Sequence, residues 1–206
     1  MTSGAALGRV MRKAATTEGE PILLFEHPKA WATWLGKNHA TSSGLWLRLA
    51  KKASRVQSLT YSEALEVALC YGWIDAQKKS ESENTWLQKF TPRTKKSIWS
   101  RINREKALAL IQAGEMKPAG LKAIESAKAD GRWDAAYDSP SRATVPPDLQ
   151  AALDRNARAK DFFATLDGAN RYAVLFRIQT AKRADTRAKR IDRFIKMLEN
   201  KEKLHP

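Results

Sequence analysis

The sequence predicts an α+β protein, with a small antiparallel sheet and helices in its N-terminal part and helices alone in its C-terminal part. Two observations lead to this fold class. Before about residue 91, short apolar runs and alternating apolar and polar residues, both typical of strands, occur between helical patterns. From about residue 100, apolar residues recur three and four positions apart, as amphipathic helices require.

The chain is long enough for one domain with a substantial core or for two small ones, because it has 206 residues. Apolar residues make up 43% and charged residues 29%, so an ordered globular protein is expected. We divide the sequence into a flexible basic arm, an α+β domain, a Pro-rich connector and a helical module, at residues 1–20, 21–131, 132–147 and 148–206.

The α+β domain up to residue 90 is expected to contain strands, two helices and a hairpin. Thr60 and Glu63 have the spacing of a capping box, which predicts that a helix begins there and runs to about Tyr71. Between residues 44 and 50 the leucines alternate with Trp46 and Arg48, which indicates a half-buried strand. The other expected elements are a strand at 22–25, a helix at 28–38 and a hairpin formed by 73–79 and 84–90.

The remaining segments are predicted to be helical. One helix covers 100–113 and ends at Gly114; the next begins at Pro118 with Leu121 and Ile124 facing inward. After the Pro-rich connector, Asp148 is expected to cap a further helix, and the chain continues as helices to about residue 200.

The charge of the chain indicates an anionic partner. The formal net charge is +15 and the isoelectric point is about 10.1, so the protein attracts polyanions at long range whatever its fold. Nucleic acid is the commonest such partner and an anionic membrane surface is the second, while a high isoelectric point also serves solubility.

The single cysteine and the N-terminus predict a cytoplasmic protein. Cys70 lies within an apolar helical pattern and has no second cysteine to pair with, which suits a reducing compartment. The first 21 residues lack the long apolar core of a signal peptide, and no run of the sequence approaches the length of a membrane span. The sequence makes no prediction of the oligomeric state.

Three stretches, "ALCYGWIDAQKK", "FTPRTKKSIWSRIN" and "DGRWDAAYDSP", occur in this order and resemble the YdeI/OmpD-associated family, whose members are often labelled bacteriocin-protection proteins. Residues 149–198 resemble the short helical module for which that family is named, and the likeness extends from about Phe25 to Leu198. The resemblance implies a role in resisting antimicrobial peptides and an association with an outer-membrane protein, and it implies no catalytic residues. The lack of an export signal argues against a periplasmic location.

The first candidate site is the basic stretch that follows the predicted hairpin and opens the next helix. Phosphate binding needs cations together with N–H or hydroxyl donors, and the first turn of a helix has free N–H groups. An ordinary solvated connection, with a capping serine and with Trp99 packed inward, is the alternative. The residues that we assign to this site are Arg93, Lys95, Lys96, Ser97, Arg101 and Arg104.

The second candidate site is the face of the last two helices. Arg183, Arg187 and Arg190 lie three and four residues apart, so they share a helix face that can follow a phosphate backbone. A plain solvated helix is the alternative, because Asp–Lys pairs four residues apart are also present. If the face binds nucleic acid, charge reversal at Arg187 and Arg190 is expected to abolish binding without unfolding the protein. The dense cations of this region are Arg171, Arg177, Lys182, Arg183, Arg187, Lys189, Arg190, Arg193 and Lys196, and the residues available to read bases are Asn170, Gln179 and Thr180.

The third candidate site is a tryptophan-lined pocket for a small antimicrobial ligand. The seven tryptophans motivate it, since large amphipathic rings serve both cores and binding surfaces. The alternative is that these rings fill the core. The residues that we assign to this pocket are Trp46, Trp73, Asp75, Trp86, Trp99, Trp133 and Tyr137.

The sequence favours a binding protein over an enzyme. Asp75 or Asp134 beside tryptophan would be the acid or base of an enzyme, but structural hydrogen bonding is the simpler explanation for both. Three histidines without ligand spacing and one cysteine predict no metal site, and no cofactor-binding motif is present. We therefore expect a non-catalytic binder of nucleic acid in a stress or resistance role, with a binder of a small antimicrobial compound as the alternative.

Overall fold

The computed structural model describes residues 11–15 and 19–206, and the chain forms two compact units. The first unit comprises Met1–Ser97 and Glu105–Trp133, and the second comprises Ile98–Arg104 and Asp134–Pro206. The predicted connector at 132–147 therefore falls almost wholly within the second unit. Residues 98–104 join that unit because the backbone of Trp99 and Arg101 is hydrogen-bonded to Tyr137.

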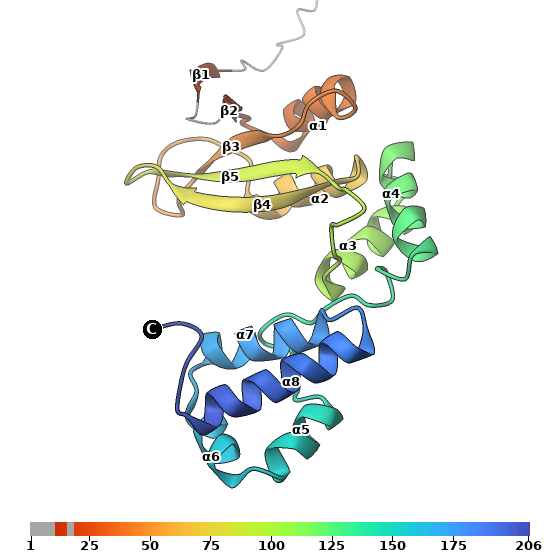
Figure 1. Ribbon diagram of the computed structural model, residues 1–206. Coiled ribbons are helices and arrows are strands. Elements are labelled where there is room, and N and C mark those ends of the chain that lie inside the picture. The colour runs from red at the N-terminus through yellow and green to blue at the C-terminus, as the bar shows by residue number, and fades with distance from the viewer. Residues whose placement is uncertain (1–10, 16–18) are drawn as a thin grey trace, which may run out of the picture. The chain divides into compact units, whose positions relative to one another are not determined.

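The first unit is built on a five-stranded sheet with the strand order β1-β2-β3-β5-β4 (Figure 1). All neighbours are antiparallel except β2 and β3, which are parallel because helix α1 connects them. The α+β class is confirmed, and the sheet is mixed rather than purely antiparallel. The elements are β1 Met11–Ala15, β2 Pro21–Leu24, α1 Pro28–Asn38, β3 Leu45–Ala50, α2 Tyr61–Cys70, β4 Trp73–Ser80 and β5 Thr85–Pro92. Most of the predicted basic arm lies outside the described residues.

The core of the first unit gathers around Trp31 of α1. Its ring lies 5.9 Å from that of Phe90 on β5 and 6.2 Å from that of Trp73 on β4, and its indole N–H donates to the carbonyl of Ala64 on α2. The predicted capping box is confirmed, because Thr60 accepts from the Glu63 N–H and Glu63 accepts from the Thr60 N–H. The hydrogen bonds that the Glu63 carboxylate accepts from the Thr60 N–H and hydroxyl lower the pKa of Glu63.

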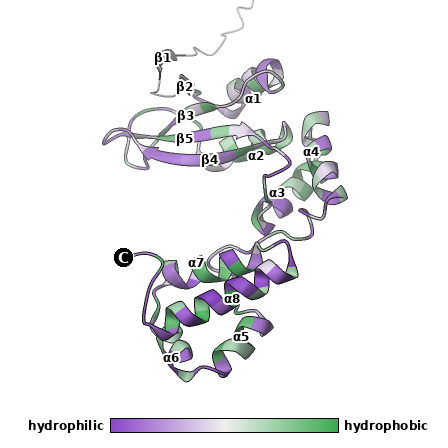
Figure 2. Ribbon diagram, in the orientation of Figure 1, coloured by the Kyte–Doolittle hydropathy of each residue, from purple (hydrophilic) through white to green (hydrophobic). Residues whose placement is uncertain are grey.

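Strand β4 forms one edge of the sheet and is hydrophilic over most of its length (Figure 2). Only Trp73 of this strand is buried, and the residues from Ala76 to Ser80 are exposed. Lys78 and Lys79 are charged residues of the kind that discourage pairing between the edges of two sheets. The same two lysines contact tryptophan rings on opposite faces of the sheet, Trp86 and Trp46.

Two further helices complete the first unit, α3 Arg101–Gln112, which begins in the second unit, and α4 Pro118–Ala129. Ile124 is buried as predicted, but Leu121 is 39% exposed, so the prediction that it faces inward was wrong. The helical period places Gly120, Ile124 and Ala127 on the inner face and leaves Leu121 beside it.

The second unit is a group of four helices, α5 Pro147–Asp154, α6 Ala157–Thr165, α7 Gly168–Gln179 and α8 Ala184–Glu199. Its core contains Phe163, Val174 and Phe194. Asn156 and Asp167 cap α6 and α7 through their side chains. The prediction that Asp148 caps α5 was wrong: Pro146 occupies the cap position, and Asp148 lies in the first turn, where it pairs with Arg187.

Replacement of Lys201 by glycine is expected to stabilise the second unit by about 0.5–1 kcal/mol. Lys201 follows α8 with a φ of +58°, which costs an L side chain energy that glycine does not incur. Urea denaturation followed by far-UV circular dichroism measures the change. Lys203→Gly is the control and should be neutral or slightly destabilising; equal effects of the two substitutions would contradict the prediction.

Candidate functional site

The first part of the predicted basic stretch is a turn held by a buried arginine. Arg132 is 7% exposed and donates to the carbonyl oxygens of Thr94 and Ser97, at 3.3 and 2.9 Å, while Asp130 pairs with it at 2.7 Å. The Ser97 hydroxyl accepts from the Thr94 N–H, so it closes this turn. Lys95 and Lys96 are exposed on the turn, whereas Arg93 is partly buried.

The second part of the stretch begins helix α3 in the second unit. Ser100 caps it by accepting from the Asn103 N–H at 3.1 Å, and Arg104 is partly buried. The side chain of Arg101 pairs with Asp138 at 3.1 Å. Asp138 is 9% exposed and also accepts from the Gln179 amide. Of the predicted cations of this stretch, Arg101 is therefore engaged in an ion pair within the second unit, while the turn itself is held by Arg132 and Ser97.

Two of the three arginines predicted to form a phosphate-binding face instead stabilise the fold. Arg187 forms a two-pronged ion pair with Asp148 at 2.6 and 2.8 Å and donates to the carbonyl of Ile178 at 3.0 Å. Arg190 donates to the carbonyl of Arg177. Both carbonyls belong to the last turn of α7, where helix carbonyls lack intrahelical partners. Charge reversal at these two positions is therefore expected to disturb folding, contrary to the expectation from the sequence.

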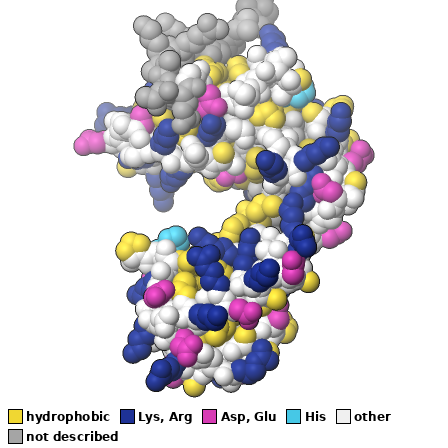
Figure 3. All heavy atoms as spheres, viewed as in Figure 1, with side chains coloured by type: hydrophobic (Ala, Val, Ile, Leu, Met, Phe, Trp, Pro, Cys, Tyr) yellow, Lys and Arg dark blue, Asp and Glu magenta, His cyan; other side chains and the backbone are white. Residues whose placement is uncertain are grey.

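Five cations at and before α8 remain exposed, and we call them the α8 cationic face: Lys182, Arg183, Lys189, Arg193 and Lys196. Figure 3 shows Lys and Arg side chains along α8 in the second unit. Arg183 lies 3.1 Å from Asp185, but both side chains are more than half exposed, so solvent screens that pair strongly. Lys189, Arg193 and Lys196 lie four and three residues apart, so they share one side of the helix.

The three side chains proposed to read bases are all used inside the second unit. Asn170 is buried and holds the C-terminal tail, because its oxygen accepts from the N–H groups of Leu204 and His205. Gln179 bonds to Asp138, and the Thr180 hydroxyl donates to a carbonyl of its own helix. These residues are therefore not available for base recognition.

The tryptophans predicted to line one pocket are mostly core residues. Trp46, Trp73, Trp99 and Trp133 are all at most 6% exposed, so their rings offer almost no surface to a ligand. Tyr137 packs edge-on against Phe176 at 4.9 Å within the second unit. Trp86 is the exception in the set, since its ring is partly exposed and borders a hollow.

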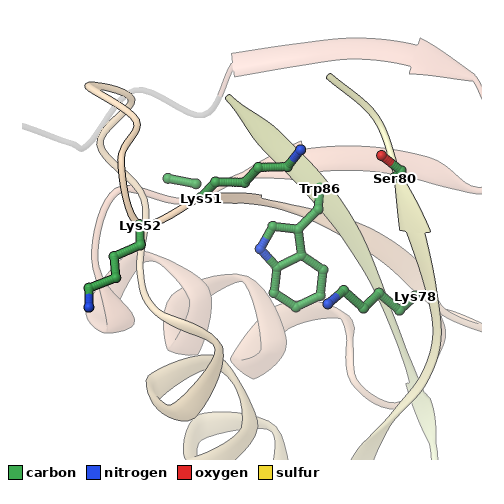
Figure 4. A pocket seen from close by; sticks show the side chains of 6 residues that line it. Lys51, Lys52, Lys78, Ser80 and Trp86 are labelled. Carbon is green, nitrogen blue, oxygen red and sulfur yellow. The ribbon is translucent and has the colours of Figure 1, made fainter. Parts of the chain in front are cut away.

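This hollow has a volume of about 480 Å³, and we call it the Trp86 hollow. Figure 4 shows the indole of Trp86 at its centre, with the Lys78 ammonium beside the six-membered ring, Lys51 along one side and Lys52 pointing away from the ring. The lining residues are Ala50, Lys51, Lys52, Lys78, Ser80 and Trp86. None of these described residues is acidic, so the hollow favours an anionic ligand.

The sequence contains part of the signal for this hollow. Lys51 and Lys52 directly follow strand β3, and the alternation of β4 places Lys78 on the same face as Ser80. The pattern does not give the register between β4 and β5, which places Ser80 opposite Trp86.

The two aspartates considered for catalysis occupy different settings. Asp75 accepts a hydrogen bond from the Tyr61 hydroxyl at 2.9 Å, and Asp134 is exposed.

Burial raises the pKa of the Cys70 thiol to about 11, which disfavours the reactive thiolate at neutral pH. Within residues 11–15 and 19–206, no group of three or more His, Cys, Asp or Glu side chains is placed to hold a metal ion.

Two family models match the chain. Residues 142–201 match the family described as "Bacteriocin-protection, YdeI or OmpD-Associated", and residues 23–123 match a domain of unknown function designated DUF8412. Neither a curated protein nor a solved structure matches the chain. None of the described helices is both long and apolar enough to cross a bilayer.

Proposed function

We propose that this chain is a non-catalytic binding protein in a stress or antimicrobial-resistance role, with nucleic acid as its partner. Residues 142–201 match the YdeI/OmpD-associated family model, which supports the resistance role. The family description mentions bacteriocin protection and specifies neither a ligand nor a reaction. The proposal of nucleic acid therefore rests on the charge of the molecule and on which cations the fold leaves exposed.

The observation that carries the proposal is the α8 cationic face. Arg187 and Arg190 are used by the fold, whereas Lys189, Arg193 and Lys196 project from one side of α8 and are exposed. Exposed cations in a row can contact successive phosphates and release the counterions bound there. Five such contacts would give a slope of about −4 to −5 in a plot of log K against log salt, reduced by the nearby Asp185 and Asp192.

We expect this face to bind duplex DNA with little preference for sequence. Sequence is read by side chains that reach base edges, whereas contacts with phosphates carry no direct sequence information. Asn170, Gln179 and Thr180, the residues that the sequence offered for base recognition, are engaged within the second unit. Competition between two duplexes of equal length and different sequence should therefore show similar affinities.

The test is charge reversal on the exposed residues alone. The triple variant Lys189→Glu, Arg193→Glu and Lys196→Glu is expected to lower affinity for a labelled duplex at least tenfold at 50 mM salt, because three phosphate contacts become repulsive. Fluorescence anisotropy at several salt concentrations measures affinity and slope together.

The matched control reverses three exposed lysines elsewhere, Lys29, Lys37 and Lys122, and so makes the same change of net charge. If the α8 cationic face is the contact, the control variant retains most of its affinity. Equal losses in the two triple variants would show that net charge alone drives binding and would contradict the assignment to α8.

The Trp86 hollow supports a second candidate function, the binding of a small antimicrobial compound. A volume of about 480 Å³ is within the range of ligand pockets. The three lysines of the lining would repel a cationic antimicrobial peptide, so this candidate is restricted to an anionic aromatic compound.

A further inference from the structure

We propose that the Trp86 hollow binds an unpaired nucleobase carrying phosphate, with the base stacked on Trp86 and the phosphates held by Lys51, Lys52 and Lys78. This inference rests on the proposed function and deepens it. The α8 cationic face is proposed to bind duplex DNA, and the Trp86 hollow adds a site for single-stranded ligands. It concerns a site in the first unit alone.

The indole of Trp86 is left partly uncovered because its neighbours on the two adjacent strands are small. In the register of the hairpin, Ser80 on β4 lies directly opposite Trp86 on β5. Ala50 ends β3 and also borders the hollow, and neither side chain is large enough to cover the indole. Trp86 is the second residue of β5 and lies next to Tyr61 at the start of α2, whose ring is 6.1 Å away.

The charges around the ring fit a phosphate-bearing ligand. Lys51, Lys52 and Lys78 are all exposed and come from two different segments of the first unit, the end of β3 and the edge strand β4. A base that stacks on the indole would therefore have cations on more than one side. Lysine ammoniums on flexible stems can follow a nucleic-acid backbone without a fixed geometry.

Lys78 covers part of the indole in the free protein, with its ammonium 4.4 Å from the ring centroid. A cation–π contact at an exposed site is worth roughly two- to fivefold in an equilibrium constant. Base stacking on an aromatic side chain is worth roughly five- to more than a hundredfold. A base can therefore displace the ammonium, which is then free to pair with the phosphate of the same ligand.

The geometry selects unpaired bases over duplex. In a duplex each base is already stacked between its neighbours, so its face is not accessible to a side chain. Single strands and free nucleotides present that face, and stacking on it depends little on which base is present. The site should therefore distinguish strandedness more strongly than sequence.

The opposite face of the sheet provides a matched control. Lys79 lies 4.5 Å from the ring centroid of Trp46, in an arrangement like that of Lys78 and Trp86. Trp46 is fully buried, so no base can stack on it. Substitution of Lys79 removes the same charge from the next position of β4 without touching the hollow.

The experiment compares a fluorescein-labelled dT12 strand with the same strand annealed to dA12, in anisotropy titrations of the full chain. Trp86→Ala is expected to lower affinity for the single strand about tenfold and to leave duplex affinity within twofold. Trp86→Phe should retain part of the single-strand affinity, and Lys78→Ala should weaken single-strand binding more than Lys79→Ala. Thermal unfolding of each variant verifies the fold, and Trp86→Phe is the conservative variant if Trp86→Ala is unstable.

Free thymidine monophosphate distinguishes the two sources of the ligand. If the nucleotide quenches tryptophan fluorescence and Trp86→Phe reduces this quenching, the site takes free nucleotides. If only dT12 quenches the fluorescence, the ligand is single-stranded nucleic acid. Unchanged single-strand affinity in folded Trp86→Ala, or equal loss for single strand and duplex, would overturn the proposal. The α8 triple variant should weaken both forms, so failure of the α8 assignment is seen separately.

Discussion

Replacement of Gly120 by alanine is expected to destabilise the first unit by about 3 kcal/mol or more, because α4 approaches α2 too closely there for a side chain. A Cβ atom at this position would lie 2.4 Å from the carbonyl oxygen of Cys70, 2.8 Å from that of Leu69 and 2.4 Å from the sulfur of Met116. The methionine side chain can move, but the two carbonyls belong to the last turn of α2 and cannot. The helices would have to separate.

Gly36 provides the control, since it is also a helical glycine of the first unit. A Cβ atom there would meet only the Tyr71 hydroxyl oxygen, at an ordinary 3.6 Å. Gly36→Ala is therefore expected to stabilise the unit by about 0.5–1 kcal/mol. Six of the seven tryptophans lie in the first unit, so urea denaturation followed by tryptophan fluorescence reports on this unit. A loss below about 1 kcal/mol in Gly120→Ala would contradict the close approach.

Local patterns were sufficient to predict most secondary structure. Pro28 at a helix start, the capping box at Thr60 and the alternation of the hairpin strands each involve residues within a few positions of one another. Cys70 is buried as the apolar pattern indicated. Such features depend on backbone propensities and periodicity, which a single sequence contains.

The structural roles of the arginines could not be predicted, because their hydrogen-bond partners are residues distant in the sequence. Arg187 pairs with a carboxylate 39 positions earlier, and Arg132 binds carbonyls 38 and 35 positions earlier. From sequence alone, Arg183, Arg187 and Arg190 form one equivalent basic face. Only the packing of α8 on α5 and α7 separates the two that are used by the fold from the one that is exposed.

The Trp86 hollow was missed for a related reason. Trp86 was assigned correctly to a strand, but its exposure depends on the small residue that the register places opposite it on β4. The tryptophans of the predicted pocket are chemically alike in the sequence, and four of them are covered by the core. Which of these rings stays partly exposed depends on the strand register and on where the helices pack.

Replacement of Arg187 by alanine is expected to destabilise the second unit by about 2 kcal/mol. The substitution removes a two-pronged ion pair with Asp148 and leaves the carbonyl of Ile178 without this donor. The Arg187 side chain is only 28% exposed, so its bonds are partly shielded from water. Hydrogen exchange of α7 and α8 peptides, measured by mass spectrometry, should show faster opening.

Arg183→Ala is the matched control, because Arg183 is 79% exposed and its pair with Asp185 contributes little. It should change the exchange of α7 and α8 only slightly. Similar acceleration in the two variants would mean that Arg187 has no special role at the end of α7, and its predicted assignment to a solvent-facing surface would regain support.

The pair between Arg187 and Asp148 also predicts a dependence on pH. The hydrogen bond from Arg187 lowers the pKa of Asp148 and raises that of Arg187. A carboxyl whose pKa is lower in the folded chain stabilises the fold above its unfolded pKa of about 3.9, and the contribution is lost as the pH falls through the folded value. The difference in unfolding free energy between the wild-type chain and Asp148→Asn should therefore be largest above pH 5 and should shrink below pH 4. Asn preserves the shape of the side chain and removes its charge, so a difference that stays constant down to pH 2 would contradict the assignment of this stabilisation to the ionised carboxylate of Asp148.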